Sequence, residues 1–244
     1  MTTALIPIGV LVTAFALSAA LVPAAAWIAR RFGAIDEPGP RKVHRMPTPR
    51  IGGIAVFAAF NIVVLAGYFA APVLSRVPWV ETHLASPVAM LQEAFRVQGK
   101  LIAMLAGGAI AFAVGLLDDV LGRRFPVGLK FAGQVLAAVV LVAGGIRTDV
   151  LVFEATNIAL TLVWVVGITN AFNLLDNMDG LSAGVAFVAS LVLLLNAWLL
   201  GEFFISLVLV ALMGSLLGFL VYNFHPASIF LGDCGSLFVG FTLA

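Results

Sequence analysis

Five aspartates in three short segments have the types and spacing best suited to chemistry. They are Asp118 and Asp119 in GLLDDVLG, Asp176 and Asp179 in NAFNLLDNMDGLSAG, and Asp233 in FLGDCGSL. Adjacent carboxylates repel each other unless a cation or a proton intervenes. Carboxylate oxygens suit Mg2+ that is bound jointly with substrate phosphates. The pattern predicts phosphoryl chemistry around a divalent cation, although a solvated helix end would explain the adjacent pair equally well if it stood alone.

Amides accompany the carboxylates in residues 170–184. If this segment is helical, its three asparagines (Asn170, Asn173 and Asn177) share one stripe. Asp176 is then a neighbour of both Asn173 and Asp179. Hydrogen bonding between helices would account for Asn170, but hardly for two carboxylates, because ionisable groups within a membrane are costly and mark functional sites.

Two glycine-containing segments complete the set of candidate residues. Gly232 and Gly235 flank Asp233 and allow backbone N–H groups to approach a ligand, and a helix that begins there suits anionic groups. Phe230 is either a stacking surface or an interfacial anchor. The basic segment RKVHRMPTPRIGG (41–53) offers cations to phosphate, although anchoring at a membrane surface explains its charges equally well.

Composition places these residues in a membrane protein. The 244 residues are 62% hydrophobic and 10% charged, with a mean hydropathy of +1.14, whereas soluble domains carry about 25% charged residues. About 20 apolar residues cross a bilayer as a helix. We therefore expect an all-α, polytopic membrane protein forming a single domain over 1–244. Its seven complete spans are predicted at 4–29, 51–71, 101–117, 129–146, 157–175, 181–200 and 204–222, with an eighth beginning near 237.

The basic residues predict how the chain is oriented. Nine of the 13 Lys and Arg lie in 30–50 and 118–130, and an excess of Lys and Arg marks cytoplasmic loops. Threading the spans through the bilayer then places four loops on the cytoplasmic side, at about 30–50, 118–130, 176–180 and 223–236. These loops hold nearly every polar cluster, so we expect one active face.

The chain stops eight residues into an apolar run, GSLFVGFTLA. Residues 237–244 would cross only about 12 Å as a helix. We expect a chain truncated from a longer protein.

The motifs HRMPTPRIGG, GLLDD, GLKFAGQ, NAFNLLDNMDGLSAG and FLGDCGSL occur in this order from about residue 36 to the end. The sequence resembles the polyprenyl-phosphate N-acetylhexosamine-1-phosphate transferase family. The resemblance implies a fold of ten or eleven spans in the inner (plasma) membrane, with the active site facing the cytoplasm. It also implies Mg2+-dependent transfer of a sugar 1-phosphate from a UDP-amino sugar to undecaprenyl phosphate, with release of UMP. Mn2+ could replace Mg2+. We expect membrane lipid as a further partner, no nucleic acid, and a possible homodimer.

The resemblance also assigns roles to residues. Those implied as catalytic are Asp118, Asp119, Asp176 and Asp179. Those implied as metal ligands are Asp233, Asp176 and Asp119. Those implied in substrate binding are Lys42, His44, Thr48, Arg50, Lys130, Asn173, Phe230 and Gly232.

Alternatives remain for the substrate and for the class of protein. The form PTPRIGG favours a UDP-GlcNAc branch, with the phospho-N-acetylmuramoyl-pentapeptide transferase as the alternative. The family's late histidine-rich loop, which helps to select the sugar, is not in this chain, which could be inactive as given. An ion-coupled transporter is the alternative from another class. It would place its carboxylates near the midplane of the membrane, in repeated halves, and the sequence shows no such repeat.

Overall fold

The structure is a computed structural model and describes residues 5–39, 46–77 and 95–244. Over these residues it contains eight α-helices, one 3-10 turn and one two-stranded antiparallel sheet. The helices are α1 (Leu5–Phe32), α2 (Gly53–Leu74), α5 (Gln98–Leu121), α6 (Val127–Ala143), α7 (Glu154–Leu175), α8 (Leu181–Leu199), α9 (Phe203–Asn223) and α10 (Gly232–Leu243). The remaining elements are η2 (Gly122–Arg124), β1 (Ile35–Asp36) and β2 (Thr48–Pro49).

The prediction of a polytopic helical membrane protein is confirmed. Within the described ranges, six helices are long and apolar enough to cross a bilayer: α1, α2, α5 together with η2, α7, α8 and α9. Helix α6 is apolar but has only 17 residues. Length and composition therefore support six of the seven complete spans that the sequence predicts.

Helix α5 extends four residues beyond the predicted end of the third span. The predicted span stops at residue 117 and the predicted loop covers 118–130, but α5 continues to Leu121 and α6 already begins at Val127. The helix ends where Gly122 adopts a φ of +55°, a conformation that other residues rarely adopt. Asp118 and Asp119 consequently lie on the last turn of a rigid helix, and the connection shortens to residues 122–126.

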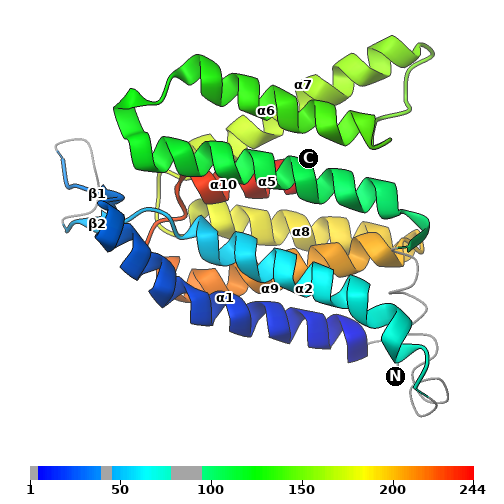
Figure 1. Cartoon of the computed structure of the whole chain (residues 1–244), viewed down its shortest axis with the longest axis horizontal. Helices are drawn as coiled ribbons and strands as arrows, with labels where there is room; N and C mark the ends of the chain where they lie inside the picture. Colours follow the sequence, from blue (N-terminus) through cyan, green and yellow to red (C-terminus); the bar gives the residue numbers. More distant parts are fainter. Residues whose placement is uncertain (1–4, 40–45, 78–94) are drawn as a thin grey trace.

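Helix α10 is short, and neighbouring helices surround it (Figure 1). Glycines allow this close approach. A Cβ on Gly53 of α2 would overlap the backbone of Gly235, and a Cβ on Gly115 of α5 would overlap the carbonyl group of Asp233. Deeper in the bundle, Phe238 of α10 packs edge-on against Phe57 and Phe60 of α2. The amino-terminal end of α10 is thereby held close to the carboxyl-terminal end of α5.

The long helices run alternately in opposite directions, so four connections meet at the end of the bundle that carries β1 and β2 (Figure 1). Backbone hydrogen bonds tie these connections together. Gly52 N donates to Phe230 O (2.9 Å), and Phe230 N donates to Pro49 O (2.8 Å). Gly180 N donates to Asn223 Oδ1 (3.1 Å). In the described residues, the connections that carry the polar clusters thus lie at one end of the bundle, and the side of the membrane that they face stays a prediction. We refer to this end as the polar end of the bundle.

Candidate functional site

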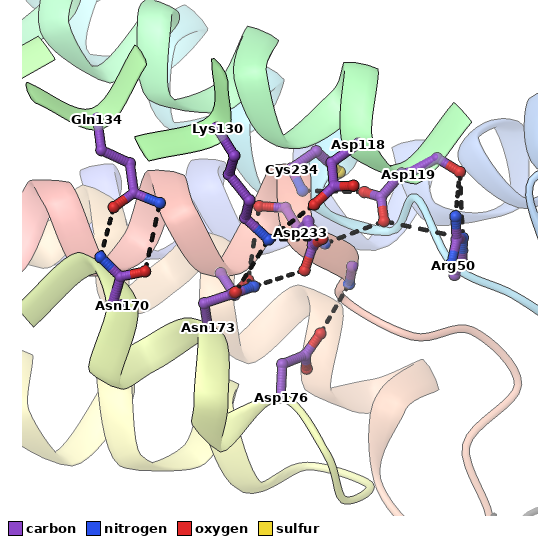
Figure 2. A network of polar contacts seen from close by, with 12 residues as sticks. Arg50, Asp118, Asp119, Lys130, Gln134, Asn170, Asn173, Asp176, Asp233 and Cys234 are labelled. Atoms are coloured by element: carbon purple, nitrogen blue, oxygen red, sulfur yellow. Dashed lines mark hydrogen bonds and ion pairs between the residues drawn. The ribbon is translucent and has the colours of Figure 1, made fainter. Parts of the chain in front are cut away.

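The polar end holds a cluster of charged and amide side chains from four helices (Figure 2). Asp118 and Asp119 come from the last turn of α5, Lys130 from the first turn of α6, Asn173 from the last turn of α7, and Asp233 from the first turn of α10. These residues lie far apart in the sequence. They meet because the helices that carry them end or begin at the same level.

Lys130 lies at the centre of the cluster. Its Nζ is 2.7 Å from Asp118 Oδ2, 2.9 Å from Asp233 Oδ2 and 3.1 Å from Asn173 Oδ1. One ammonium group thus serves two carboxylates and an amide, which uses all three of its donors. The Lys130 side chain is 17% exposed, so these interactions are only partly screened by water.

Asn173 completes the surroundings of Asp233. Its Nδ2 donates to Asp233 Oδ1 and, over 3.0 Å, to Ser236 Oγ. Both oxygens of Asp233 therefore have donors, one from Lys130 and the other from Asn173. This arrangement fixes the orientation of the Asp233 carboxylate.

Two carboxylates, one from α5 and one from the connection after α7, accept hydrogen bonds from the amino-terminal N–H groups of α10. Asp119 Oδ1 accepts from Asp233 N (3.1 Å), and Asp119 Oδ2 accepts from Cys234 N (2.9 Å). Asp176 Oδ2 accepts from Gly232 N (2.9 Å). The residue at the helix's own N-cap, Leu231, provides no side-chain cap. Negative charge here stabilises the positive end of the helix dipole and satisfies N–H groups that otherwise lack partners.

Asp119 is accordingly the most deeply buried of these acids, with 4% of its surface exposed. Arg50, from the segment after β2, donates from Nε to the backbone carbonyl oxygen of Asp119 (3.2 Å) and also from Nη2 to the same atom. Its Nε lies 3.9 Å from Asp119 Oδ1. The guanidinium thus binds the carboxyl-terminal turn of α5, where a cation is favoured. Arg50 contacts the cluster through Asp119.

Gly232 lies where three parts of the chain converge. Its φ is +77°, and a Cβ there would overlap the carbonyl oxygen of Arg50 and lie 2.7 Å from Asp119 Oδ2. The structure thus explains this glycine by close backbone packing. The implied role of Gly232 in substrate binding stays a prediction.

Asp176 lies in the connection after α7. Its Oδ2 accepts the hydrogen bond from Gly232 N, and its Oδ1 takes no part in that bond. Burial raises the pKa of its carboxyl group well above the ordinary value of 3.8. The Gly232 N–H lowers this pKa, and the negative charges of Asp119 and Asp233 raise it further. The accumulated negative charge means that a cation close to Asp176 would be favoured.

The side chain of Asp179 contacts the connection between α9 and α10. Its Oδ2 is 2.8 Å from His225 Nδ1 and accepts from Ala227 N (3.1 Å). The expected helical stripe is wrong beyond residue 175, because α7 ends at Leu175 and a turn ending at Gly180, with φ of +70°, follows it. Asp176 and Asp179 therefore point to different partners rather than forming one pair.

Two other residues implied in substrate binding, Thr48 and Phe230, lie in the connections at the polar end. Thr48 is 6% exposed, and its hydroxyl donates to Met46 O (3.0 Å). Phe230 is half-buried, with its backbone bonded to Pro49 and Gly52; its proposed stacking on a base stays a prediction. Lys42 and His44 lie outside the described residues.

Three polar residues near the site were not among the site residues predicted from the sequence. Ser236 accepts from Asn173, His225 contacts Asp179, and Gln134 pairs with Asn170. A signal was present for Gln134, because GLKFAGQ places it one helical turn after Lys130. His225 offered no comparable signal.

The donor set fits Mg2+. No group of three or more His, Cys, Asp or Glu side chains is arranged for a metal ion in the ranges described. However, Asp118 and Asp233 each direct one oxygen to the same cationic group. Mg2+ commonly takes only one or two carboxylates and fills its remaining positions with water and substrate phosphate oxygens. Asp118 and Asp233 therefore match the usual number of protein ligands, and Mg2+ binding itself stays a prediction.

Comparison with known proteins places this arrangement in context. Residues 101–244 match the model of the family described as Glycosyl transferase family 4. Over 92% of this chain, the sequence is 35% identical to a probable undecaprenyl-phosphate N-acetylglucosaminyl 1-phosphate transferase of Bacillus subtilis. Over 89%, it is 35% identical to the decaprenyl-phosphate N-acetylglucosaminephosphotransferase of Mycobacterium tuberculosis. Over 88%, it is 31% identical to the phospho-N-acetylmuramoyl-pentapeptide-transferase of Geobacillus kaustophilus.

The matched regions cover 57%, 54% and 65% of these three relatives, respectively. The chain thus spans about half of the length of the first two and somewhat more of the third.

Proposed function

Because the chain belongs to glycosyl transferase family 4, we propose that the protein transfers N-acetylglucosamine 1-phosphate from UDP-N-acetylglucosamine to undecaprenyl phosphate. A phosphate oxygen of the lipid forms a bond to the β-phosphorus of the nucleotide sugar. The bond between that phosphorus and the bridging oxygen breaks, and UMP leaves with the bridging oxygen. The product is a polyprenyl pyrophosphoryl sugar, the first lipid-linked intermediate of a cell-surface polymer.

One observation carries this proposal: Lys130 Nζ, two carboxylates and an amide converge at one end of a membrane-embedded bundle. The acceptor phosphate of a polyprenyl lipid is confined to the membrane surface, while the nucleotide sugar is water-soluble. Their reaction needs a charged site at the boundary between the two phases. Phosphoryl transfer depends mainly on positioning and on neutralising charge, and these side chains provide both.

Lys130 is the residue that we assign to the phosphates of the substrates. Its ammonium group is a compact charge with three donors, and the four-carbon side chain can exchange one carboxylate partner for a phosphate oxygen. Asn173 then holds Asp233 in place from the other side. Asp119 and Asp176 keep the amino terminus of α10 in position.

Asp118 and Asp233 would hold Mg2+, and the metal-binding roles that the resemblance implies for Asp119 and Asp176 stay predictions. When bound, the ion supplies charge neutralisation on the pyrophosphate and on the leaving UMP. The acceptor phosphate needs little help from a general base, because its second pKa is about 6. We therefore assign Asp118 to binding and orientation rather than to proton removal.

The proposed orientation follows the positive-inside rule. The polar end carries Arg30, Arg31 and Arg50, together with Arg123 and Arg124 of η2, so we assign this end to the cytoplasm. We further propose α6 as a seventh span, because 17 residues are at the lower limit for crossing, and α10 as the beginning of an eighth. The membrane is then the plasma membrane, which holds the polyprenyl phosphate.

The test is UMP release by the purified full-length protein in detergent or in liposomes. We expect UMP only when UDP-N-acetylglucosamine, undecaprenyl phosphate and Mg2+ are all present. A donor panel that includes UDP-N-acetylmuramoyl-pentapeptide distinguishes the two kinds of relative. If only UDP-N-acetylmuramoyl-pentapeptide is turned over, that nucleotide sugar is the donor in place of UDP-N-acetylglucosamine. Absence of turnover with every donor, in folded protein, would refute the enzyme assignment.

A further inference from the structure

A pair of side-chain amides, one buried (Gln134) and one half-buried (Asn170), joins α6 and α7 close to Lys130. Gln134 Nε2 lies 3.4 Å from Asn170 Oδ1, and Asn170 Nδ2 donates back to Gln134 Oε1 (Figure 2). Gln134 is 2% exposed. Asn170 Nδ2 also donates to Val166 O over 2.8 Å, which determines the direction in which this amide faces. We refer to Gln134 and Asn170 as the amide pair.

The amide pair lies between the polar cluster and the apolar part of the same interface. One turn toward the polar end, Lys130 of α6 contacts Asn173 of α7. In the opposite direction, the two helices pack through an apolar cluster that includes Ala137, Ala138 and Leu141 of α6 and Val165 and Val166 of α7. Because the helices are antiparallel, the Lys130–Asn173 contact and the amide pair form two successive steps of one ladder.

Apolar and polar contacts constrain this interface differently. Packing between small aliphatic side chains is non-directional, so it tolerates small rotations and shifts of one helix along the other. Hydrogen bonds need both the correct distance and the correct angle. A single buried polar pair can therefore select one register among several packings of similar free energy.

We propose that the amide pair fixes the register of α6 against α7 and thereby holds Lys130 Nζ between Asp118 and Asp233. Lys130 is carried by α6 and Asn173 by α7, yet both must reach the same carboxylate, Asp233. Gln134 and Asn170 are positioning residues, because they touch Lys130 and Asp233 only through the helices that they join. The consequence for catalysis rests on the proposed function, whereas the effect on register does not.

The decisive variant replaces both amides, Gln134→Leu with Asn170→Leu. Removing both partners of a hydrogen bond together leaves no unpaired buried group and can be nearly neutral for stability. We expect a melting temperature close to that of the unmodified protein. We expect kcat for UMP release to fall by about tenfold to 100-fold with little change in KM for the nucleotide sugar, since a displacement of about 1 Å at a catalytic group has an effect of that size.

Two further variants separate positioning from stability. Exchanging the amides, Gln134→Asn with Asn170→Gln, keeps the combined length of the two side chains and should restore most of kcat. Leu141→Ala removes apolar packing from the cluster that α6 and α7 share with α5 and α10, without touching the amides. It should lower the melting temperature by several degrees and leave kcat nearly unchanged.

The distance between two spin labels provides a readout that does not depend on catalysis. The labels are attached at Phe131→Cys on α6 and Leu174→Cys on α7, where the native side chains are 54% and 74% exposed. The native Cys234 is fully buried and is not expected to react. The dipolar coupling between the labels should give one narrow distribution of distances when Gln134 and Asn170 are both present. The distribution should be broader or shifted when both are leucine, and narrow again in Gln134→Asn with Asn170→Gln.

Broadening with restoration supports the inference even if no donor gives UMP, in which case only the proposed function fails. An unchanged distance in the double leucine variant overturns the inference, whatever the effect on kcat.

Discussion

The ammonium group of Lys130 lies 2.9 Å from Asp233 Oδ2 and joins the first turn of α6 to the first turn of α10. The same nitrogen is 2.7 Å from Asp118, so that two carboxylates share one cation. A divalent ion bound by these two carboxylates would lie close to the ammonium group of Lys130 and would repel it. Lys130 is therefore both a candidate phosphate ligand and the group that keeps Asp118 and Asp233 together before the ion binds.

Replacing Lys130 with Met should reduce UMP release by more than about 100-fold, because the phosphates lose a charged partner at the reacting centre. The variant should also respond more strongly to metal. Mn2+ is expected to raise its melting temperature further than that of the unmodified protein, since the ion replaces the missing positive charge between the carboxylates. Thermal unfolding with increasing Mn2+ measures this.

Arg124→Met is the matched control for Lys130→Met, because Arg124 is exposed and lies nearby in the sequence. It should match the unmodified protein in its response to Mn2+. An equal response of all three proteins would show that Lys130 does not compete with the ion.

Asp119→Asn should mainly lower the stability of the protein, whereas Asp233→Asn should mainly lower its activity. An asparagine at 119 presents an NH2 group to one of the two N–H groups that Asp119 now accepts from α10. This change should destabilise the protein by about 1–3 kcal/mol. Asp233→Asn should unfold at nearly the normal temperature but lose most of its activity. Melting temperature and kcat for both variants test the distinction; the reverse pattern would contradict our assignment of Asp119 as the anchor of α10.

Gly232→Ala should destabilise the polar end by more than about 2 kcal/mol, because the position combines a positive φ with an overlap against the carbonyl oxygen of Arg50. The matched control is Gly184→Ala in α8, where an added Cβ meets no atom within 4 Å. Alanine there should be neutral or slightly stabilising. Chemical or thermal unfolding of both variants provides the comparison, and equal stabilities would refute the close packing at Gly232.

Asp176 should make stability depend on pH. The pKa of its carboxyl group is raised in the folded protein above the ordinary value of 3.8, so the folded state binds this proton more tightly than the unfolded chain does. The stabilising contribution is complete below about pH 4 and is lost as the pH rises through the raised pKa. In EDTA, the melting temperature should therefore fall over this interval, and the fall should be smaller in Asp176→Asn.

Added Mg2+ should reduce the difference between Asp176→Asn and the unmodified protein at higher pH, since a nearby cation favours the ionised carboxylate. Parallel pH profiles of the two proteins in EDTA would show that Asp176 does not titrate as the structure indicates.

The sequence predicted the helices and the gathering of the acids, because both follow from patterns within single segments. Long apolar runs define spans, and alternating direction brings Asp118, Asp176 and Asp233 to one end. It did not reveal that Asp119 and Asp176 bind the amino terminus of α10, since this depends on how closely three helices approach through Gly53, Gly115 and Gly232.

The contact between Asp179 and His225 could not be predicted from the sequence either. A helix continued past Leu175 would have placed Asp179 beside Asp176, whereas the turn at 176–180 directs it to His225. Where an element stops decides which face a polar residue presents. At α5, the helix continues to Leu121, so Asp118 and Asp119 lie on its last turn rather than in a loop.

The central claim is that this cluster transfers a sugar 1-phosphate to a lipid phosphate. The most direct measurement uses UDP-N-acetylglucosamine labelled with 32P at either the α- or the β-phosphorus, incubated with the full-length protein, undecaprenyl phosphate and Mg2+. We predict β-label in the lipid extract and α-label in UMP, and loss of both in Asp233→Asn. Label that appears only in water-soluble sugar phosphate, or α-label in the lipid, would contradict the account.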